Sequence, residues 1–211
     1  MAQEVRHPIF ARLYARLSPD AERKGAAEHR RELLSGLEGR VIEVGAGNGL
    51  NFRHYPSTVS EVIAVEPEDY LRPLAEQAAG EASVPIRVVD GLADQLPAGD
   101  GEFDSAVASL VLCSVPDQAS ALGELHRVIR PGGELRFYEH VLASDPGFAR
   151  MQRVVGRVWP LFAGGCHCDR ETVAAIAAGG FEVESCRRFP FRPSPIILPA
   201  TPHVLGVATR S

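Results

Sequence analysis

Three glycines at alternate positions, Gly45, Gly47 and Gly49, lie between a short apolar segment and a segment with helical periodicity. Glycine permits a tight turn and a close approach of the backbone to a ligand, because any Cβ would collide there. A glycine turn between a strand and a helix is typical of a nucleotide-type site at the edge of a parallel sheet. A dinucleotide-binding loop would have its third glycine at position 50, which is Leu50, so this pattern indicates another ligand.

Polar or glycine-containing segments also follow the next predicted strands. Glu66 ends the second strand, 66 − 49 = 17 residues after the last glycine of the loop, where a carboxylate can accept hydrogen bonds from both ribose hydroxyls. Residues 90–97, DGLADQLP, follow the third strand, and residues 109–115, SLVLCSV, end the fourth. Arg130-Pro131-Gly132-Gly133 is predicted to be a turn that stops a helix and re-enters the sheet.

The order and spacing of these segments resemble those of class I S-adenosylmethionine (SAM) methyltransferases. The segments are the glycine loop with Glu43, then Glu66, and then residues 90–97, 109–115 and 130–133. The resemblance implies SAM as cofactor, with S-adenosylhomocysteine as product. It places at the cofactor Tyr14, Glu43, Gly45, Ala46, Gly47, Asn48, Asn51, Glu66, Pro67, Gly91, Leu92, Ser109, Leu110 and Cys113. Many relatives have an aspartate where this chain has Leu92. The adenine amino group would then contact Asp90, or the backbone and a water.

A narrower resemblance covers about residues 40–209. The segments that carry it are LVLCSV, Glu139-His140-Val141, Trp159, Gly165-Cys166 with Arg170-Glu171, and Pro202-His203-Val204 with Gly206. They look like the methyltransferase-like group that includes thiol S-methyltransferases. This implies a small hydrophobic acceptor, with a thiol favoured. Two alternatives remain: a phospholipid amine or quinone-type acceptor, and a SAM-binding protein without turnover.

Methyl transfer from a sulfonium is an in-line displacement, for which the enzyme mainly supplies proximity, alignment and exclusion of water. A thiol with a pKa of about 8.5 needs only modest help to become a thiolate, and one histidine suffices. His140 at the end of the fifth predicted strand and His203 at the start of the last strand are the candidate bases. Either histidine could instead serve only in packing.

Cys166-His167-Cys168 suggests a metal site at first sight. A closed zinc site needs four ligands, usually from two clusters, and no second cluster is visible in the sequence. We therefore predict no metal.

The elements that must position these residues alternate between helix and strand. Helices are predicted over 8–17, where Ser18-Pro19 ends the first one, and over 21–37, 70–80, 117–129, 148–161 and 170–178. Strands are predicted over 41–44, 61–66, 85–89, 103–109, 133–140, 181–189 and 203–210. The alternation predicts an α/β fold with a mostly parallel sheet covered by helices on both faces. The resemblance implies a Rossmann-like seven-stranded sheet of order 3-2-1-4-5-7-6 with the last strand antiparallel.

We expect the 211 residues to form one methyltransferase domain. Residues 1–38 would be lid helices, 39–140 the SAM-binding core and 141–211 the half that covers the acceptor. The apolar residues of 8–17 and 148–162 would close over the acceptor.

Composition limits the partners. The net charge is −5 and no long basic run occurs, which speaks against nucleic acid. No apolar run approaches the roughly 20 residues that span a bilayer, and the N-terminus does not have the pattern of a signal peptide. We therefore expect a cytoplasmic protein with its four cysteines reduced. The helix over 8–17 is only mildly basic, so membrane contact is not favoured, and the oligomeric state stays open.

Overall fold

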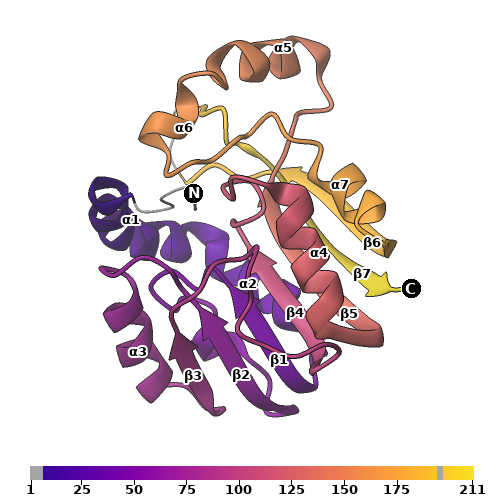
Figure 1. Ribbon diagram of the computed structural model, residues 1–211. Helices are drawn as coiled ribbons and strands as arrows, with labels where there is room; N and C mark the ends of the chain where they lie inside the picture. Colours follow the sequence, from indigo (N-terminus) through magenta and orange to yellow (C-terminus); the bar gives the residue numbers. More distant parts are fainter. Residues whose placement is uncertain (1–6, 194–196) are drawn as a thin grey trace.

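The computed structural model describes residues 7–193 and 197–211 of the chain. Its seven strands form one sheet of order β3-β2-β1-β4-β5-β7-β6, in which β7 is antiparallel to both of its neighbours (Figure 1). The predicted order and the antiparallel last strand are therefore confirmed. The strands are β1 (Gly39–Val44), β2 (Val59–Val65), β3 (Ile86–Val89), β4 (Phe103–Ser109), β5 (Ile129–His140), β6 (Phe181–Pro190) and β7 (Pro202–Arg210).

Successive side chains of a strand point to opposite faces of the sheet. Both sets are apolar in the central strands, so helices cover both faces. Val41 of β1 packs with Leu33 of α2 (Ala27–Leu34), on the face that α3 (Arg72–Gly80) also covers. The next residue, Ile42, packs in the other cluster with Leu122 of α4 (Gln118–Val128). The helix α7 (Thr172–Ala178) lies on that second face through Ile176. Both faces of the central strands are thus buried, as the continuous apolar runs predict.

The N-terminal helices differ from the prediction. Helix α1 (Pro8–Ala21) does not end at Ser18-Pro19, since Pro19 lies inside it and the N–H of Glu22 donates to carbonyls of that last turn. A π-helical turn, η1 (Glu22–Ala26), joins α1 to α2, and Gly25 at φ 119° makes the bend. Of the predicted apolar face, Ile9 is 86% exposed and Leu13 and Leu17 are also exposed. The side of α1 that faces the molecule carries Phe10, Ala11 and Tyr14.

Two further predicted boundaries are wrong. The predicted helix over 148–161 is broken at Gly156 into α5 (Pro146–Val155) and α6 (Trp159–Phe162). A Cβ at Gly156 would lie 2.9 Å from Asp169 Oδ2, so a close chain crossing accompanies the break. Residues 130–133 are not a turn before the strand but a bulge within β5, where the pairing with β4 shifts register.

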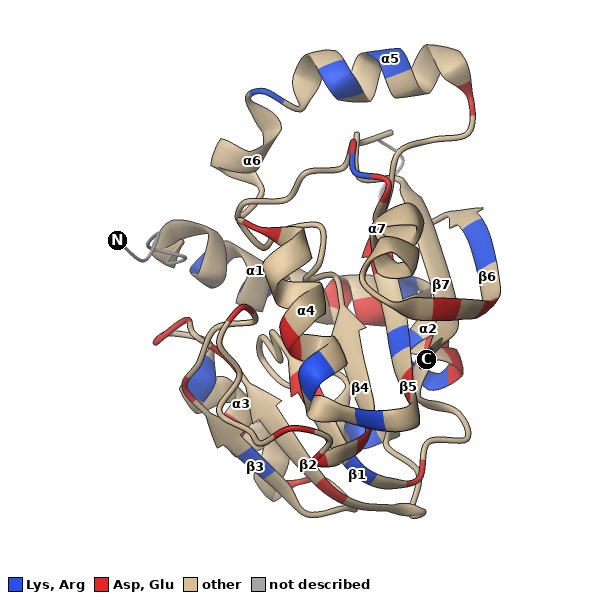
Figure 2. Ribbon diagram, turned by 45° about the vertical axis from the view of Figure 1, so that its right-hand side comes forward, with Lys and Arg blue, Asp and Glu red and all other residues tan. Residues whose placement is uncertain are grey.

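The elements beyond the carboxyl ends of the parallel strands are α1, α5 and α6, which lie at the same end of the molecule (Figure 1). Basic and acidic residues are interspersed along most of the ribbon, and α5 carries basic bands (Figure 2). Within residues 7–193 and 197–211, no helix has the length and apolar character that crossing a membrane requires.

Candidate active site

A cavity lies beyond the carboxyl ends of β1, β2, β4 and β5, where open α/β sheets bind their ligands. Its walls come from α1, the glycine loop, the segments after β2, β3 and β4, and the segment 163–166. The lining residues are His7, Phe10, Ala11, Tyr14, Gly45, Gly47, Val65, Glu66, Pro67, Glu68, Leu71, Gly91, Leu92, Ala93, Asp94, Ser109, Leu110, Val111, Ser114, Val115, Pro116, Asp117, His140, Ala163, Gly164 and Cys166.

The glycine loop presents bare backbone to this cavity. Gly45 and Gly47 have φ values of 62° and 60°, in the left-handed region that side chains rarely adopt. A Cβ at Gly45 would lie 2.4 Å from Val111 Cγ2, and a Cβ at Gly47 would lie 3.3 Å from Tyr14 Cε1. Glycine at these positions therefore lets the loop, the segment after β4 and helix α1 meet around one space.

Glu66 lines the cavity although its side chain is only 4% exposed. Its Oε2 accepts a hydrogen bond from the Gly47 N–H at 2.6 Å, and its Oε1 accepts one from the Glu68 N–H at 2.8 Å. Burial raises the pKa of Glu66 to about 7, because desolvation outweighs these two bonds. Each oxygen keeps a lone pair with which a ligand hydroxyl can bond.

Behind the loop lies a buried polar network. Glu43 accepts hydrogen bonds from Asn51 Nδ2 at 2.8 Å and from the Tyr55 hydroxyl at 2.7 Å. Arg30 donates to Asn51 Oδ1 at 2.8 Å and forms a buried ion pair with Glu22 at 2.8 Å. This network connects the N-terminal helices to the floor of the glycine loop.

Arg30 also donates to Ser109 Oγ at 3.0 Å, so it joins the loop to the end of β4. Arg30 could not be predicted from the sequence, because an arginine within a helix carries no local sign of burial. Five residues predicted at the cofactor do not line the cavity: Glu43, Ala46, Asn48, Asn51 and Cys113. Asn48 instead donates to Ser18 Oγ at 3.1 Å, which holds the loop against α1.

The end of the cavity formed by the segment after β3 contains Gly91, Leu92 and Asp94. Asp90, one of the residues considered for the adenine contact, is paired with Arg72 at 2.9 Å and does not line the cavity. Within this segment, the carboxylate that lines the cavity is that of Asp94, two residues after Leu92, which was not among the residues predicted to contact the adenine. The bridge between Leu92 and Gln95 turns the chain there and brings Asp94 to the cavity.

At the opposite end, the loop after β4 is held by a buried carboxylate. Glu139, fully buried, accepts hydrogen bonds at 3.0 Å from the backbone N–H groups of Val111, Leu112 and Cys113. Leu110, just before them, has φ 62° and is the one non-glycine residue with positive φ among the described residues. Backbone held in a sparsely populated conformation is a frequent property of functional sites.

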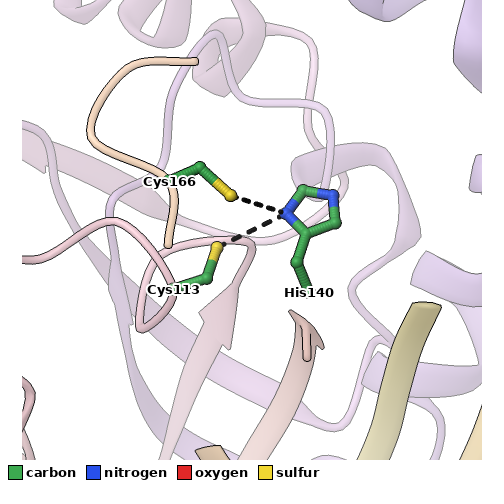
Figure 3. A group of neighbouring side chains, drawn as sticks. All are labelled: Cys113, His140 and Cys166. Carbon is green, nitrogen blue, oxygen red and sulfur yellow. Dashed lines mark hydrogen bonds between the residues drawn. The ribbon is translucent and has the colours of Figure 1, made fainter. Parts of the chain in front are cut away.

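Of the two histidines, only His140 lines the cavity. Its Nδ1 lies 3.4 Å from Cys113 Sγ and 3.4 Å from Cys166 Sγ (Figure 3). His203 is buried behind it, with the ring centroids 4.5 Å apart, and pairs through Nδ1 with the carbonyl of Thr201 at 2.8 Å. Burial lowers the pKa of His203 well below its usual value.

Comparisons with known proteins agree with this geometry. Residues 42–137 match a methyltransferase domain family. Human thiol S-methyltransferase TMT1B is 33% identical over 95% of this chain and 86% of its own. The chain belongs to the SAM-dependent methyltransferases.

More distant relatives show how broad the family is. A ubiquinone/menaquinone biosynthesis C-methyltransferase of Methylobacterium nodulans is 31% identical over 72% of this chain and 60% of its own. The solved structure of a SAM-dependent methyltransferase from Thermotoga maritima, described as a possible histamine N-methyltransferase, superposes with a TM-score of 0.72 at 23% identity. It covers 96% of this chain and 98% of that one.

The cavity of this methyltransferase fits SAM, the cofactor of its family. The bare glycine backbone admits a ligand at close range, and the buried Glu66 carboxyl matches a pair of ribose hydroxyls. Of the residues predicted at the cofactor, the cavity brings together Tyr14, Gly45, Gly47, Glu66, Pro67, Gly91, Leu92, Ser109 and Leu110.

Proposed function

We propose that this methyltransferase transfers the methyl group of SAM to a small hydrophobic thiol. The observation that carries the proposal is the identity with human thiol S-methyltransferase TMT1B, which extends over 95% of the chain. The similarity therefore includes the residues beyond the SAM-binding core, where acceptors are distinguished. A match limited to the core would have supported only the cofactor.

In the proposed complex, SAM lies along the glycine loop, where Glu66 accepts hydrogen bonds from its ribose. Pro67, Leu92 and Asp94 enclose the adenine end, and Ser109 and Leu110 lie beside the methionyl end. SAM supplies an already activated methyl group on a sulfonium. The chain's own contribution is to align that methyl group with the acceptor and to keep water away.

The acceptor end combines apolar walls with one histidine. Phe10 of α1, Val111 and Val115 after β4, and Ala163 form the apolar part. A Cβ at Gly164 would lie 2.4 Å from the Phe10 ring, so α1 and the segment 163–166 close against each other. An apolar enclosure suits a small lipophilic acceptor. His140 is the residue here that can assist removal of the thiol proton.

The proposed roles of the chain segments follow the division predicted from the sequence. Residues 39–140 bind SAM, and the N-terminal helices together with residues 141–211 cover the acceptor. The second candidate acceptors are a phospholipid amine and a quinone-type carbon, the latter because a quinone-pathway C-methyltransferase is 31% identical over 72% of the chain.

The test is to incubate the purified protein with SAM and pairs of acceptors that differ only in the reacting atom: alkyl and aryl thiols, and the matching alcohols, phenols and amines. S-adenosylhomocysteine and methylated products are measured by mass spectrometry. We expect methyl thioethers from the thiols and much lower turnover of their oxygen and nitrogen counterparts.

A quinone precursor and phosphatidylethanolamine vesicles are included as rival acceptors. Methylation of either rival without methylation of any thiol contradicts the proposal. SAM binding without product from any acceptor would favour a non-catalytic binding protein. His140→Gln is compared with Cys186→Ser on the exposed part of β6, and we expect only His140→Gln to lower turnover about 100-fold.

A further inference from the structure

Three side chains that could bind a metal converge at the acceptor end of the cavity. Cys113 comes from the loop after β4, His140 ends β5, and Cys166 belongs to the segment before α7. The two Sγ atoms and His140 Nδ1 all lie within 4.8 Å of one another, and Nδ1 is 3.4 Å from each sulfur (Figure 3). Within residues 7–193 and 197–211, these three residues form the one group of three or more potential metal ligands whose ligand atoms lie this close together.

The spacing matches a tetrahedral thiolate and imidazole site. Zinc binds sulfur at about 2.3 Å and histidine nitrogen at about 2.05 Å, and a tetrahedral angle then separates nitrogen from sulfur by about 3.6 Å. The observed separation of 3.4 Å for both sulfurs is close to that value. Thiolates and imidazole are the ligands that zinc prefers over magnesium or calcium.

We propose that Cys113, His140 and Cys166 bind one thiophilic divalent cation, zinc in the first instance, with its fourth coordination position directed to the cavity. Two of the three ligands, His140 and Cys166, line that cavity, which gives a fourth ligand access. Three protein ligands with one open position distinguish a reactive zinc site from a closed structural one.

The backbone around the ligands is already fixed. The Cys113 N–H donates to Glu139 Oε2 at 3.0 Å, and the Cys113 carbonyl accepts from the His167 N–H at 2.7 Å. The Cys166 N–H donates to the Ala163 carbonyl at 3.1 Å. The rings of His140 and His203 are in edge contact, which restrains the imidazole. Ligands held by such surrounding contacts need little reorganisation to bind a metal.

The sequence could not indicate this site, because its ligands are separated by 27 and 26 residues rather than grouped in a C-x-x-C pattern. The local triplet that did attract attention, Cys166-His167-Cys168, is divided in the structure. Only Cys166 joins the group, while Cys168 is buried in the same apolar cluster as Cys113 and Cys166, with Trp159 and Ala200 packed against that cluster.

The consequence for catalysis rests on the proposed thiol acceptor. The acceptor sulfur takes the fourth position and releases its proton to water, because a coordinated thiol is deprotonated outright. Its lone pair then forms the new sulfur–carbon bond as the sulfonium–methyl bond breaks. S-adenosylhomocysteine leaves, and the neutral thioether is a weaker ligand than the thiolate and dissociates. No redox change occurs, and with the cation bound His140 acts as a ligand through Nδ1, so that the cation takes over the part in removing the thiol proton that His140 has without it.

The test is metal binding by the whole protein, purified under a phosphine reductant and stripped with a chelator. Cobalt(II) is titrated in, and absorption from thiolate-to-cobalt charge transfer is recorded before zinc is added as competitor. We expect one equivalent of cobalt to bind with that absorption and zinc to displace it. Cys113→Ser, Cys166→Ser and His140→Gln should each weaken zinc binding by more than about 100-fold.

Two cysteine variants serve as controls: Cys168→Ala, buried beside the site, and Cys186→Ser, exposed on β6. Both should keep full metal binding. Zinc should also raise the melting temperature of the wild type and of the controls, but not that of Cys166→Ser. Thermal unfolding of each metal-free variant shows that it is folded. Wild-type zinc affinity no higher than that of Cys113→Ser, or equal loss in Cys186→Ser, overturns the site.

The two proposals fail separately. Cobalt absorption and zinc affinity need neither SAM nor an acceptor, so they report on the site even when no thiol is methylated. Conversely, thiol methylation at an undiminished rate by the stripped protein supports the proposed function and overturns the role of the cation in it.

Discussion

Glu66 combines two backbone hydrogen bonds with the ribose contact that we propose for it. Its carboxyl is buried and accepts two backbone hydrogen bonds, which hold the glycine loop and the segment after β2 in place. Burial raises its pKa to about 7, so a substantial share of the molecules carries a neutral Glu66 near neutral pH. Only the carboxylate can accept bonds from both backbone groups and from two ribose hydroxyls.

SAM affinity is therefore expected to rise with pH up to about 7 and then level off. Below that pH the ionised fraction falls about tenfold per unit, which is about 1.36 kcal/mol of binding free energy per unit. Glu66→Gln should flatten this dependence and weaken binding at pH 8 by roughly 1.5–3 kcal/mol. Calorimetric titration with SAM from pH 5.5 to 8.5 measures both effects.

Glu76→Gln on the outer side of α3 is the matched control, since it removes an exposed carboxylate near the site without touching the cavity. It should keep the pH dependence of the wild type. An equally steep dependence in Glu66→Gln would show that another group controls SAM binding.

At the scale of elements, helix α5 and the segments around it are held together by one buried amide. Gln152 of α5 is fully buried, and the two N–H groups of its Nε2 are shared among the carbonyl oxygens of Val141, Cys168 and Pro199. Its Oε1 accepts from the Ala143 N–H at 2.7 Å. One side chain thus connects α5 to three loops around the site.

Gln152→Leu keeps the approximate shape but leaves these backbone groups without partners. We expect it to lower the free energy of unfolding by about 2–4 kcal/mol. Arg153→Gln, exposed on the same helix, should change it by less than about 0.5 kcal/mol. Denaturant unfolding monitored by circular dichroism compares the two variants. Equal stabilities would mean that α5 is held by its apolar contacts alone.

The strands around the glycine loop could be predicted because their apolar runs and glycines are local signals. The extent of α1 could not, since Pro19 suits the end of a helix as well as the interior in which it lies. The bulge at residues 130–133 depends on pairing with β4. Arg30 and the Cys113, His140 and Cys166 group are products of tertiary contacts, which no local spacing reveals.

At the scale of the whole molecule, buried carboxyls and partly buried histidines have opposite effects on stability as the pH changes. Burial raises the pKa of both Glu43 and Glu66 to about 7, so the folded state holds protons that the unfolded state has lost. Burial lowers the pKa of His29, His54 and His126, so there the unfolded state binds the protons. Between pH 5 and 7 the carboxyls make stability fall as pH rises, and the histidines make it rise.

Removing one buried carboxyl should change the pH dependence of the unfolding free energy in a defined direction. Glu43 stabilises the folded state most below its unfolded pKa of about 4.3, and this contribution is lost as pH rises through about 7. Between pH 5 and 7 the wild type should therefore lose about 2 kcal/mol of unfolding free energy that Glu43→Gln keeps, so the variant gains that much stability relative to the wild type. Urea unfolding without SAM measures this shift, which does not depend on any constant cost of losing the Asn51 and Tyr55 bonds. The control Glu76→Gln should show no such shift. If the stability difference between Glu43→Gln and the wild type is the same at pH 5 and pH 7, Glu43 is already ionised in the folded protein at pH 5.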